Sequence, residues 1–261
     1  MTSTPALEPL WFTDEGAGPP VLLVHGWTCD SYDWSFQYEA FTARHRVIGV
    51  DLRGHGRSAV TPSGYSPEAL AGDLADLIDR LGCGPVVAVG HSAGGMVVSS
   101  LSIDRPDLVR AVVSVDPGYG IGPELGAMLA AAGPAIAAPE GGTVAVDLLL
   151  GVEPHAPSWL RQWHRRRTLA CPPHVRREMW QAMYEAPDQF GLRDASEKYL
   201  RARHVPVLAF HRLPETASWE QGLFRDDLSH AVSWEGTGHW LHQERSEDFN
   251  QLTLDWIAAL P

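Results

Sequence analysis

The sequence predicts an α/β protein in which helices cover both faces of a mainly parallel β-sheet. Short, uninterrupted apolar runs recur along the chain, and such runs are typical of strands buried on both faces of a sheet. Segments with the leucine spacing of helices lie between these runs. One run also leads directly into the turn Gly90-His91-Ser92-Ala93-Gly94 and then into a helix-like pattern. Strands that alternate with helices in this way build parallel sheets.

The expected strands are spread over most of the chain. Leu10-Trp11-Phe12 predicts the first strand, and the segment from Asp14 to Pro20 that follows is rich in residues that favour turns. The later strands are expected in continuous apolar runs, which are Val21–Val24, Val47–Val50, Val86–Val89, Ala111–Val115 and Val205–Phe210.

The clearest predicted helix covers residues 67–81. Its apolar residues recur at steps of three and four, which places them on one helix face. Pro67 is favourable at the first helical position, and Gly82 is favourable just after the last. The apolar residues of this face are Leu70, Leu74, Leu77, Ile78 and Leu81.

The alternation of strands and helices stops between about Gly118 and Arg203 and resumes at Val205. We therefore predict residues 1–117 as the first part of an α/β core, 118–203 as an inserted helical cap, and 204–261 as the second part of the core. The cap segment holds ten of the twenty Lys and Arg residues. Within it, Arg165-Arg166-Arg167 favours a solvated helix face, and attraction of an acidic substrate is the alternative.

The composition narrows the class of partner. A net charge of -12 argues against nucleic acid or an anionic membrane, because binding to phosphates needs clustered Lys and Arg. The sequence shows neither a signal-peptide pattern nor an apolar run that could span a membrane, so we expect a cytoplasmic protein with small-molecule partners. Cys29, Cys83 and Cys171 are too scattered for a disulfide framework or a zinc site, and we expect buried thiols. The oligomeric state stays open.

The turn around Ser92 is the strongest functional signal. A strand that reverses into a helix within a few residues holds its central residue in strained geometry, so glycine is needed at the flanking positions Gly90 and Gly94. This G-x-S-x-G pattern, with a strand before it and a helix after it, predicts that Ser92 is exposed as a nucleophile at the edge of the sheet.

Four segments together resemble the α/β-hydrolase family, and the resemblance covers nearly the whole chain. It implies a sheet of about eight strands with helices on both sides and a cap after the sixth strand. It also implies a serine esterase or lactonase that needs no metal or cofactor. The four segments occur in the family's order, as His25-Gly26-Trp27, Asp51 to Ser58, the Ser92 turn and Gly236-Thr237-Gly238-His239.

A serine hydroxyl needs a base within hydrogen-bond reach before it can attack a carbonyl carbon. His239 is the candidate, because it follows a strand-like segment, residues 230–234, and a glycine-rich turn. The developing oxyanion needs N–H donors. We expect these from the amide of Ala93, directly after the nucleophile, and from Trp27, where the resemblance points. Asp51 to Ser58 are expected to brace a loop.

The acid that would orient His239 is ambiguous in the sequence. The common family pattern places a Gly and then an Asp after the strand at Val207 to Phe210, whereas this chain has no Gly there and offers Glu215. A second known family site lies 24 residues after the nucleophile, which is Asp116 here. We favour Asp116, with Glu215 as the alternative and Asp226 or Asp227 as lesser candidates.

The leading functional hypothesis is hydrolysis of a carboxylic ester or lactone through an acyl-enzyme. Family members that cleave haloalkanes or epoxides use an Asp where this chain has Ser92, which argues against those activities. A cofactor-free dioxygenase, a carbon–carbon bond hydrolase or lyase, and a non-enzymatic ligand-binding protein are the alternatives. Tryptophans in cap and loop segments suggest an apolar, flat or aromatic substrate, although core packing is the ordinary use of Trp. The candidates for contact with substrate are Trp159, Trp163, Trp180 and Trp240.

Overall fold

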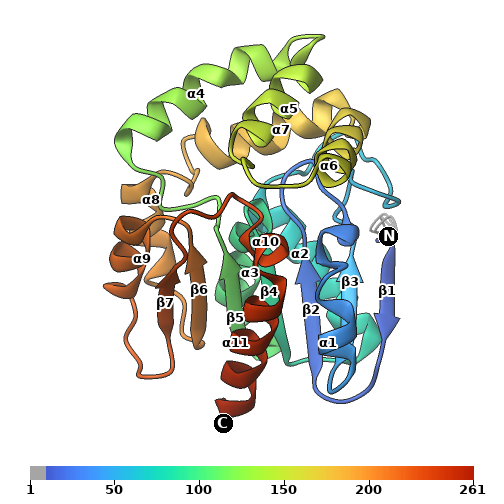
Figure 1. Cartoon of the computed structure of the whole chain (residues 1–261), viewed down its shortest axis with the longest axis vertical. Helices are drawn as coiled ribbons and strands as arrows, with labels where there is room; N and C mark the ends of the chain where they lie inside the picture. The colour runs from blue at the N-terminus through green and yellow to red at the C-terminus, as the bar shows by residue number, and fades with distance from the viewer. Residues whose placement is uncertain (1–9) are drawn as a thin grey trace, which may run out of the picture.

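The computed structural model describes residues 10–261 and contains one seven-stranded sheet with the order β1-β3-β2-β4-β5-β6-β7 (Figure 1). Only β1 runs antiparallel to its neighbour, β3, and all other neighbouring pairs are parallel. The strands are β1 Phe12–Glu15, β2 Pro20–Val24, β3 Arg46–Val50, β4 Val86–His91, β5 Val109–Val115, β6 Val207–His211 and β7 His230–Ser233. The predicted α/β class with a mainly parallel sheet is confirmed.

The helices come from all parts of the described chain. The short 3-10 helices are η1 Ser31–Trp34 and η2 Pro106–Leu108. The α-helices are α1 Tyr38–Thr42, α2 Pro67–Leu81, α3 Ala93–Asp104, α4 Pro123–Ala137, α5 Gly141–Gly151, α6 Ser158–Ala170, α7 Pro173–Tyr184, α8 Arg193–Leu200, α9 Pro214–Gln221, α10 Leu241–Glu244 and α11 Ser246–Ala259.

Two details of the strands differ from the expectation. Residues 10–261 form seven strands, whereas the family resemblance implied about eight. The first strand also begins later than expected and includes Asp14 and Glu15, which the sequence pattern assigned to a turn. These polar residues are tolerated because β1 is an edge strand with one open side. Arg46 on β3 also binds Asp14 through two hydrogen bonds of 2.8 and 2.7 Å.

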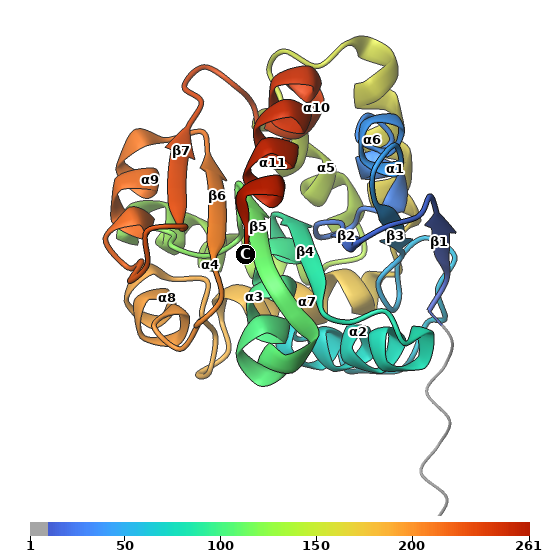
Figure 2. The same cartoon turned by 90° about the horizontal axis from the view of Figure 1, so that it is seen from below.

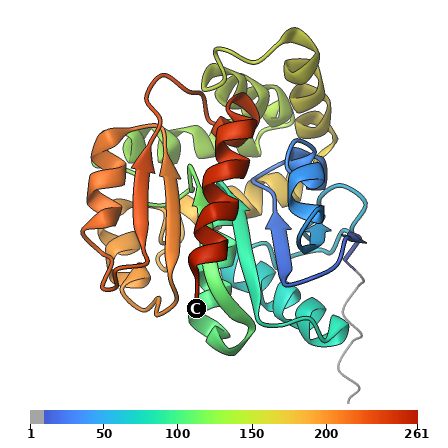
Figure 3. The ribbon, with the colours of Figure 1, turned by 60° about the horizontal axis from the view of Figure 1, so that its bottom comes forward.

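Helices cover both faces of the sheet, and each face has its own apolar core. Figure 2 shows α1 and α11 on one face and α2 and α3 on the other. Figure 3 shows α11 lying along the sheet, where Phe249 and Ile257 are buried. The predicted helix at residues 67–81 is α2, with Ser66 capping its first turn and Gly82 ending it at a φ of 57°.

The segment between β5 and β6 is helical and holds α4 to α8. Four of these helices, α4 to α7, lie over the upper end of the sheet in Figure 1, which is the end where the parallel strands have their carboxyl termini. Apolar residues of α7, among them Val175 and Met179, belong to the same buried cluster as α2 and α3. Within residues 10–261 no helix is long and apolar enough to cross a membrane.

Candidate active site

Ser92 lies alone between a strand and a helix. β4 ends at His91, α3 begins at Ala93, and Ser92 has a φ of 54° and a ψ of -120°, which an L-residue rarely adopts. A Cβ at Gly90 would lie 2.3 Å from the carbonyl oxygen of Gly94, and a Cβ at Gly94 would lie 2.4 Å from the carbonyl oxygen of Val24. Both glycines are thus required by sterics, and the side chain of Ser92, which is half-buried, is presented beyond the end of β4.

His239 and Asp116 meet beside this turn. Nδ1 of His239 lies 2.6 Å from Oδ2 of Asp116, which follows the last residue of β5 and has a φ of 38°. A carboxylate can only accept, so Nδ1 carries the proton and Nε2 is left with a free lone pair. Nε of Arg212 donates to the same carboxylate oxygen at 2.8 Å. The acid is therefore held by two donors from different parts of the chain.

Burial and charge set the protonation of this pair. Burial by itself raises the pKa of Asp116, but the hydrogen bond with His239 and the nearby charges hold it well below its usual range. Burial lowers the pKa of His239 to about 4, against the opposing effect of Asp116. At neutral pH the pair is therefore a carboxylate and a neutral imidazole, which is the state that a general base requires.

The loop after β2 lies against the nucleophile turn. A Cβ added to Gly26 would lie 3.0 Å from Cβ of Ser92. Outside the helices and strands of residues 10–261, the amides of Trp27 and Ala93 donate to no backbone carbonyl. The indole of Trp27 makes a different contact, since its Nε1 donates to the carbonyl of Arg176 on α7 at 2.9 Å.

The other candidate acids lie elsewhere. Glu215 is exposed in the first turn of α9, and the described residues show no contact between it and His239. Pro214 starts that helix three residues after the end of β6, and Glu215 is exposed at the surface there. Asp226 caps a turn by accepting from Leu228 and Ser229. The geometry thus brings only Asp116 to the imidazole among the acids considered.

The loop from Asp51 to Ser58 has the bracing contacts that we expected. Asp51 accepts from the amides of Ser31 at 2.7 Å and Arg57 at 2.8 Å. The guanidinium of Arg53 forms an ion pair with Asp73 on α2. These contacts tie the loop to the core and to the segment that carries Trp27.

The four candidate tryptophans have different surroundings. Trp180 is buried against Trp27, with 4.8 Å between the ring centroids. Trp240 is also buried, stacked on His164 of α6 at 4.3 Å. Trp159 is 58% exposed, so its ring is mostly in water. Trp163 lines a cavity of about 430 Å³ between α6 and the loops after β2 and β3, together with Tyr32 and Arg57. Ser92 and His239 do not line this cavity.

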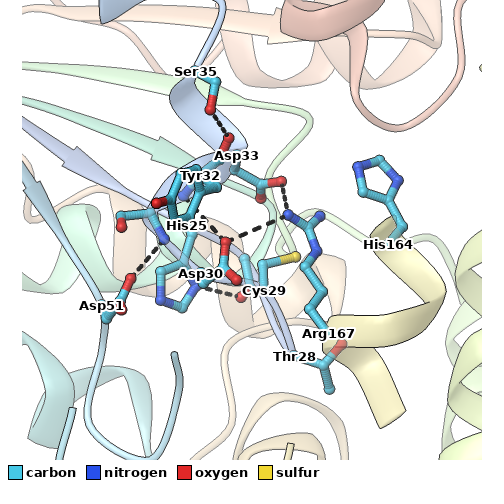
Figure 4. Close-up of polar contacts among 12 residues, drawn as sticks. His25, Thr28, Cys29, Asp30, Tyr32, Asp33, Ser35, Asp51, His164 and Arg167 are labelled. Atoms are coloured by element: carbon cyan, nitrogen blue, oxygen red, sulfur yellow. Dashed lines mark hydrogen bonds and ion pairs between the residues drawn. The ribbon is translucent and has the colours of Figure 1, made fainter. Parts of the chain in front are cut away.

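A buried ion pair between α6 and η1 was missed by the sequence pattern. Arg165 and Arg166 are exposed as expected for a solvated face, but Arg167 is buried, and its Nη1 lies 2.5 Å from Oδ1 of Asp33 (Figure 4). The arginine triplet is therefore not uniformly solvated. Helical spacing could have indicated that Arg167 is buried, although not its partner, because Leu160, His164, Arg167 and Thr168 form the buried face of α6.

The described residues contain no group of three His, Cys, Asp or Glu side chains that could hold a metal ion. Cys29, Cys83 and Cys171 are free and buried, as expected. Burial raises the pKa of the Cys171 thiol to about 12, which keeps it protonated.

A parallel sheet with a strand-to-helix turn at Ser92 and an Asp–His pair beside it defines a class of hydrolytic enzymes. The pattern of the alpha/beta hydrolase family matches residues 21–252, so the chain belongs to this family.

Known proteins of several activities are similar to this chain. Bifunctional epoxide hydrolase 2 of Sus scrofa is 36% identical over 113 residues, which cover 42% of this chain and 20% of that protein. A non-heme haloperoxidase of Rhodococcus erythropolis is 42% identical over 87 residues, 33% of this chain and 32% of that one. The chain thus matches about a fifth to a third of the length of these curated relatives. The solved structure of a thermophilic esterase from Thermogutta terrifontis is similar over 99% of this chain and 96% of its own, with a TM-score of 0.83 and 28% identity.

Proposed function

We propose that this protein hydrolyses a carboxylic ester or lactone of an apolar or aromatic substrate through an acyl-enzyme. The observation that carries the proposal is the 2.6 Å contact between His239 and Asp116, on loops next to the strained turn that presents Ser92. A buried carboxylate bound to a neutral histidine, with a serine hydroxyl on the adjoining turn, is the arrangement that can activate the hydroxyl for attack on an acyl carbon.

In the proposed reaction, Oγ of Ser92 attacks the carbonyl carbon and its proton passes to Nε2 of His239. The negative charge that forms on the carbonyl oxygen is bound by the amides of Trp27 and Ala93. The intermediate collapses, and His239 gives its proton to the leaving alkoxide. Water then attacks the acyl-enzyme, with His239 again as the base, and the acid and free Ser92 result. These steps use only groups of this chain and water.

One observation favours acyl transfer over epoxide opening. Opening of an epoxide by this fold forms an alkyl ester on a carboxylate, and this chain has the hydroxyl of Ser92 at that position. The proposal also includes a cytoplasmic location, because the three cysteines are unpaired.

The test is a screen of p-nitrophenyl esters, from acetate to aromatic acids, together with aromatic lactones, using the native protein and Ser92→Ala. A fluorophosphonate should label Ser92 at one equivalent and abolish turnover, with the mass of the labelled peptide as the readout. Hydrolysis by a protein that does not react with the probe would exclude the acyl-enzyme on Ser92, and a protein that neither hydrolyses these substrates nor reacts with the probe would point to ring-cleaving oxygenase chemistry or ligand binding. Either result would contradict the proposal.

A further inference from the structure

Both polar groups of the His239 backbone have partners in other parts of the fold. Its N–H donates to the carbonyl of Val152 at 2.8 Å, at the end of α5 in the cap. Its C=O accepts from Nε2 of His91 at 3.0 Å. His239 lies in a loop, so these two bonds, together with the side-chain contact to Asp116, determine where the imidazole lies.

His91 links the nucleophile turn to the base. It directly precedes Ser92, it is fully buried, and its ring lies 4.6 Å from the ring of His239. Since a carbonyl oxygen only accepts, Nε2 of His91 must carry a proton. The other ring nitrogen, Nδ1, faces Oδ2 of Asp33 at 3.6 Å. Asp33 thus lies next to His91 as a charged neighbour, at a longer distance than the 2.6 Å hydrogen bond that joins Asp116 to His239.

The cap supplies the charge that holds Asp33. Nη1 of Arg167 on α6 lies 2.5 Å from Oδ1 of Asp33 and 3.9 Å from Oδ1 of Asp30, as the dashed lines of Figure 4 show. Asp33 is fully buried, and the Arg167 side chain is 5% exposed. A buried carboxylate without its cation is strongly unfavourable, so the docking of α6 and the placement of Asp33 depend on each other.

The loop that joins α5 to α6 makes further contacts beside His239. Nδ1 of His164 on α6 lies 2.5 Å from Oε1 of Glu153, the residue after Val152. The ring of His164 stacks on Trp240, the residue after His239. A Cβ at Gly238 would lie 2.9 Å from the carbonyl oxygen of Val152. The loop with His239 is therefore packed directly against the segment that joins α5 to α6.

We propose that His91 and Arg167 are positioning residues for His239, so that the docked cap is part of the support of the catalytic base. His91 holds the carbonyl of His239, Arg167 holds Asp33 behind His91, and the same docking presents Val152 to the amide. This inference rests on the proposed function for its effect on turnover, but the placement of His239 can be measured without any substrate.

Matched variants separate positioning from general stability. His91→Gln keeps an N–H donor near the place of Nε2, whereas His91→Phe keeps the ring and loses the donor. Arg167→Met removes the buried charge, Arg167→Lys retains one, and Arg166→Met makes the same change at the exposed neighbour. We expect His91→Phe and Arg167→Met to lower kcat at least tenfold with KM changed less than about twofold, because orientation of the base is lost and substrate binding is not. His91→Gln and Arg166→Met should stay within about threefold of the native kcat, and Arg167→Lys should lie between.

The decisive readout is the tautomer of His239. In NMR spectra, two-bond correlations from the carbon-bound ring protons to the ring nitrogens report the tautomer even when the N–H proton exchanges with water. The signals of His239 are assigned by their loss in His239→Ala. The native protein, His91→Gln and Arg166→Met should show the proton on Nδ1, whereas His91→Phe and Arg167→Met should show a mixture. The same signals in all five proteins would overturn the proposal, whatever the turnover.

If the native protein hydrolyses no ester, the proposed function fails, and the tautomer of His239 still decides this inference. Should Arg167→Met fail to fold, the comparison of His91→Phe with His91→Gln decides it.

Discussion

Asp116 and His239 are 123 residues apart in sequence, and their side chains are joined by a contact of 2.6 Å. The carboxylate comes from the end of β5 and the imidazole from the loop after β7, on either side of β6 in the sheet. The contact therefore depends on the correct order of three strands. It also gives the proposed function its clearest tests.

Replacement of the nucleophile should separate catalysis from folding. We expect Ser92→Ala to lower kcat by several orders of magnitude, because the only group that can form the acyl-enzyme is removed. The free energy of unfolding should change little, since the half-buried hydroxyl has no hydrogen bond in the described structure. Ester turnover and urea unfolding of the two proteins provide the measurements. A variant with more than about a tenth of the native turnover on every accepted ester would exclude the acyl-enzyme.

Replacement of the acid should distinguish the two candidates. Asp116→Asn should lower kcat by roughly 10⁴, because an amide cannot hold the Nδ1–H tautomer of His239 and cannot stabilise the imidazolium. Glu215→Gln should cost less than about tenfold, since Glu215 is exposed on α9. Steady-state kinetics of the two variants on one ester make the comparison. Equal losses of kcat in the two variants would show that the contact between Asp116 and His239 does not support turnover.

The loss of activity at acid pH should report the protonation of the His239 imidazole. Because the base must be neutral and its pKa is lowered to about 4, kcat/KM should fall below about pH 4 and should be level from there toward neutral pH. Asp116 raises this pKa, so the residual activity of Asp116→Asn should show a limb at lower pH. Each sample is returned to pH 7 and assayed again, which separates titration from irreversible unfolding. A limb near pH 6.5 in the native protein would mean that burial does not control His239.

Two cap tryptophans should differ in their effect on substrate binding. Trp180 packs on Trp27, next to the amide proposed for the oxyanion, whereas Trp159 is 58% exposed. Trp180→Leu should therefore raise KM for bulky aromatic esters more than for an acetate ester, because uniform binding surface is lost. Trp159→Leu is the matched control and should leave both KM values within about twofold. The opposite order would place the substrate against the outer face of α6.

The parts of the structure that follow local rules could be predicted from the sequence. Helix α2 needed only its apolar spacing, Pro67 and Gly82, and the turn at Ser92 needed only the glycines that its backbone geometry requires. The contact of Asp116 with His239 could be proposed but not decided against Glu215, because it depends on where separate strands end. The pairing of Arg167 with Asp33 follows no local pattern, since it depends on how α6 docks on η1. Long-range contacts of this kind were the ones that the sequence left open.

A last prediction concerns a buried charge cluster away from the proposed site. Oε1 of Glu220 on α9 lies 2.7 Å from Nη2 of Arg203, and its Oε2 lies 2.7 Å from Nε2 of His211. Burial by itself raises the pKa of Glu220, but Arg203 and His211 lower it to about 2, below the ordinary value of 4.5. A carboxyl with a lowered folded-state pKa stabilises the fold above its unfolded pKa. This contribution should therefore be complete above about pH 4.5 and should be lost as the pH falls toward 2.

Urea unfolding as a function of pH tests this linkage. Glu220→Gln leaves Arg203 buried without its counter-ion, so we expect the free energy of unfolding at pH 7 to fall by about 3–5 kcal/mol. Glu197→Gln removes the exposed pair with Arg201 and should cost less than about 1 kcal/mol. Between pH 4.5 and 2 the native protein and the Glu197 variant should lose stability more steeply than the Glu220 variant, which lacks the titrating group. Parallel curves for all three proteins would mean that another carboxylate controls acid unfolding. The leading alternative would then be Asp33, which is buried beneath α6. Its pKa is also held well below its ordinary value, mainly by the charge of Arg167.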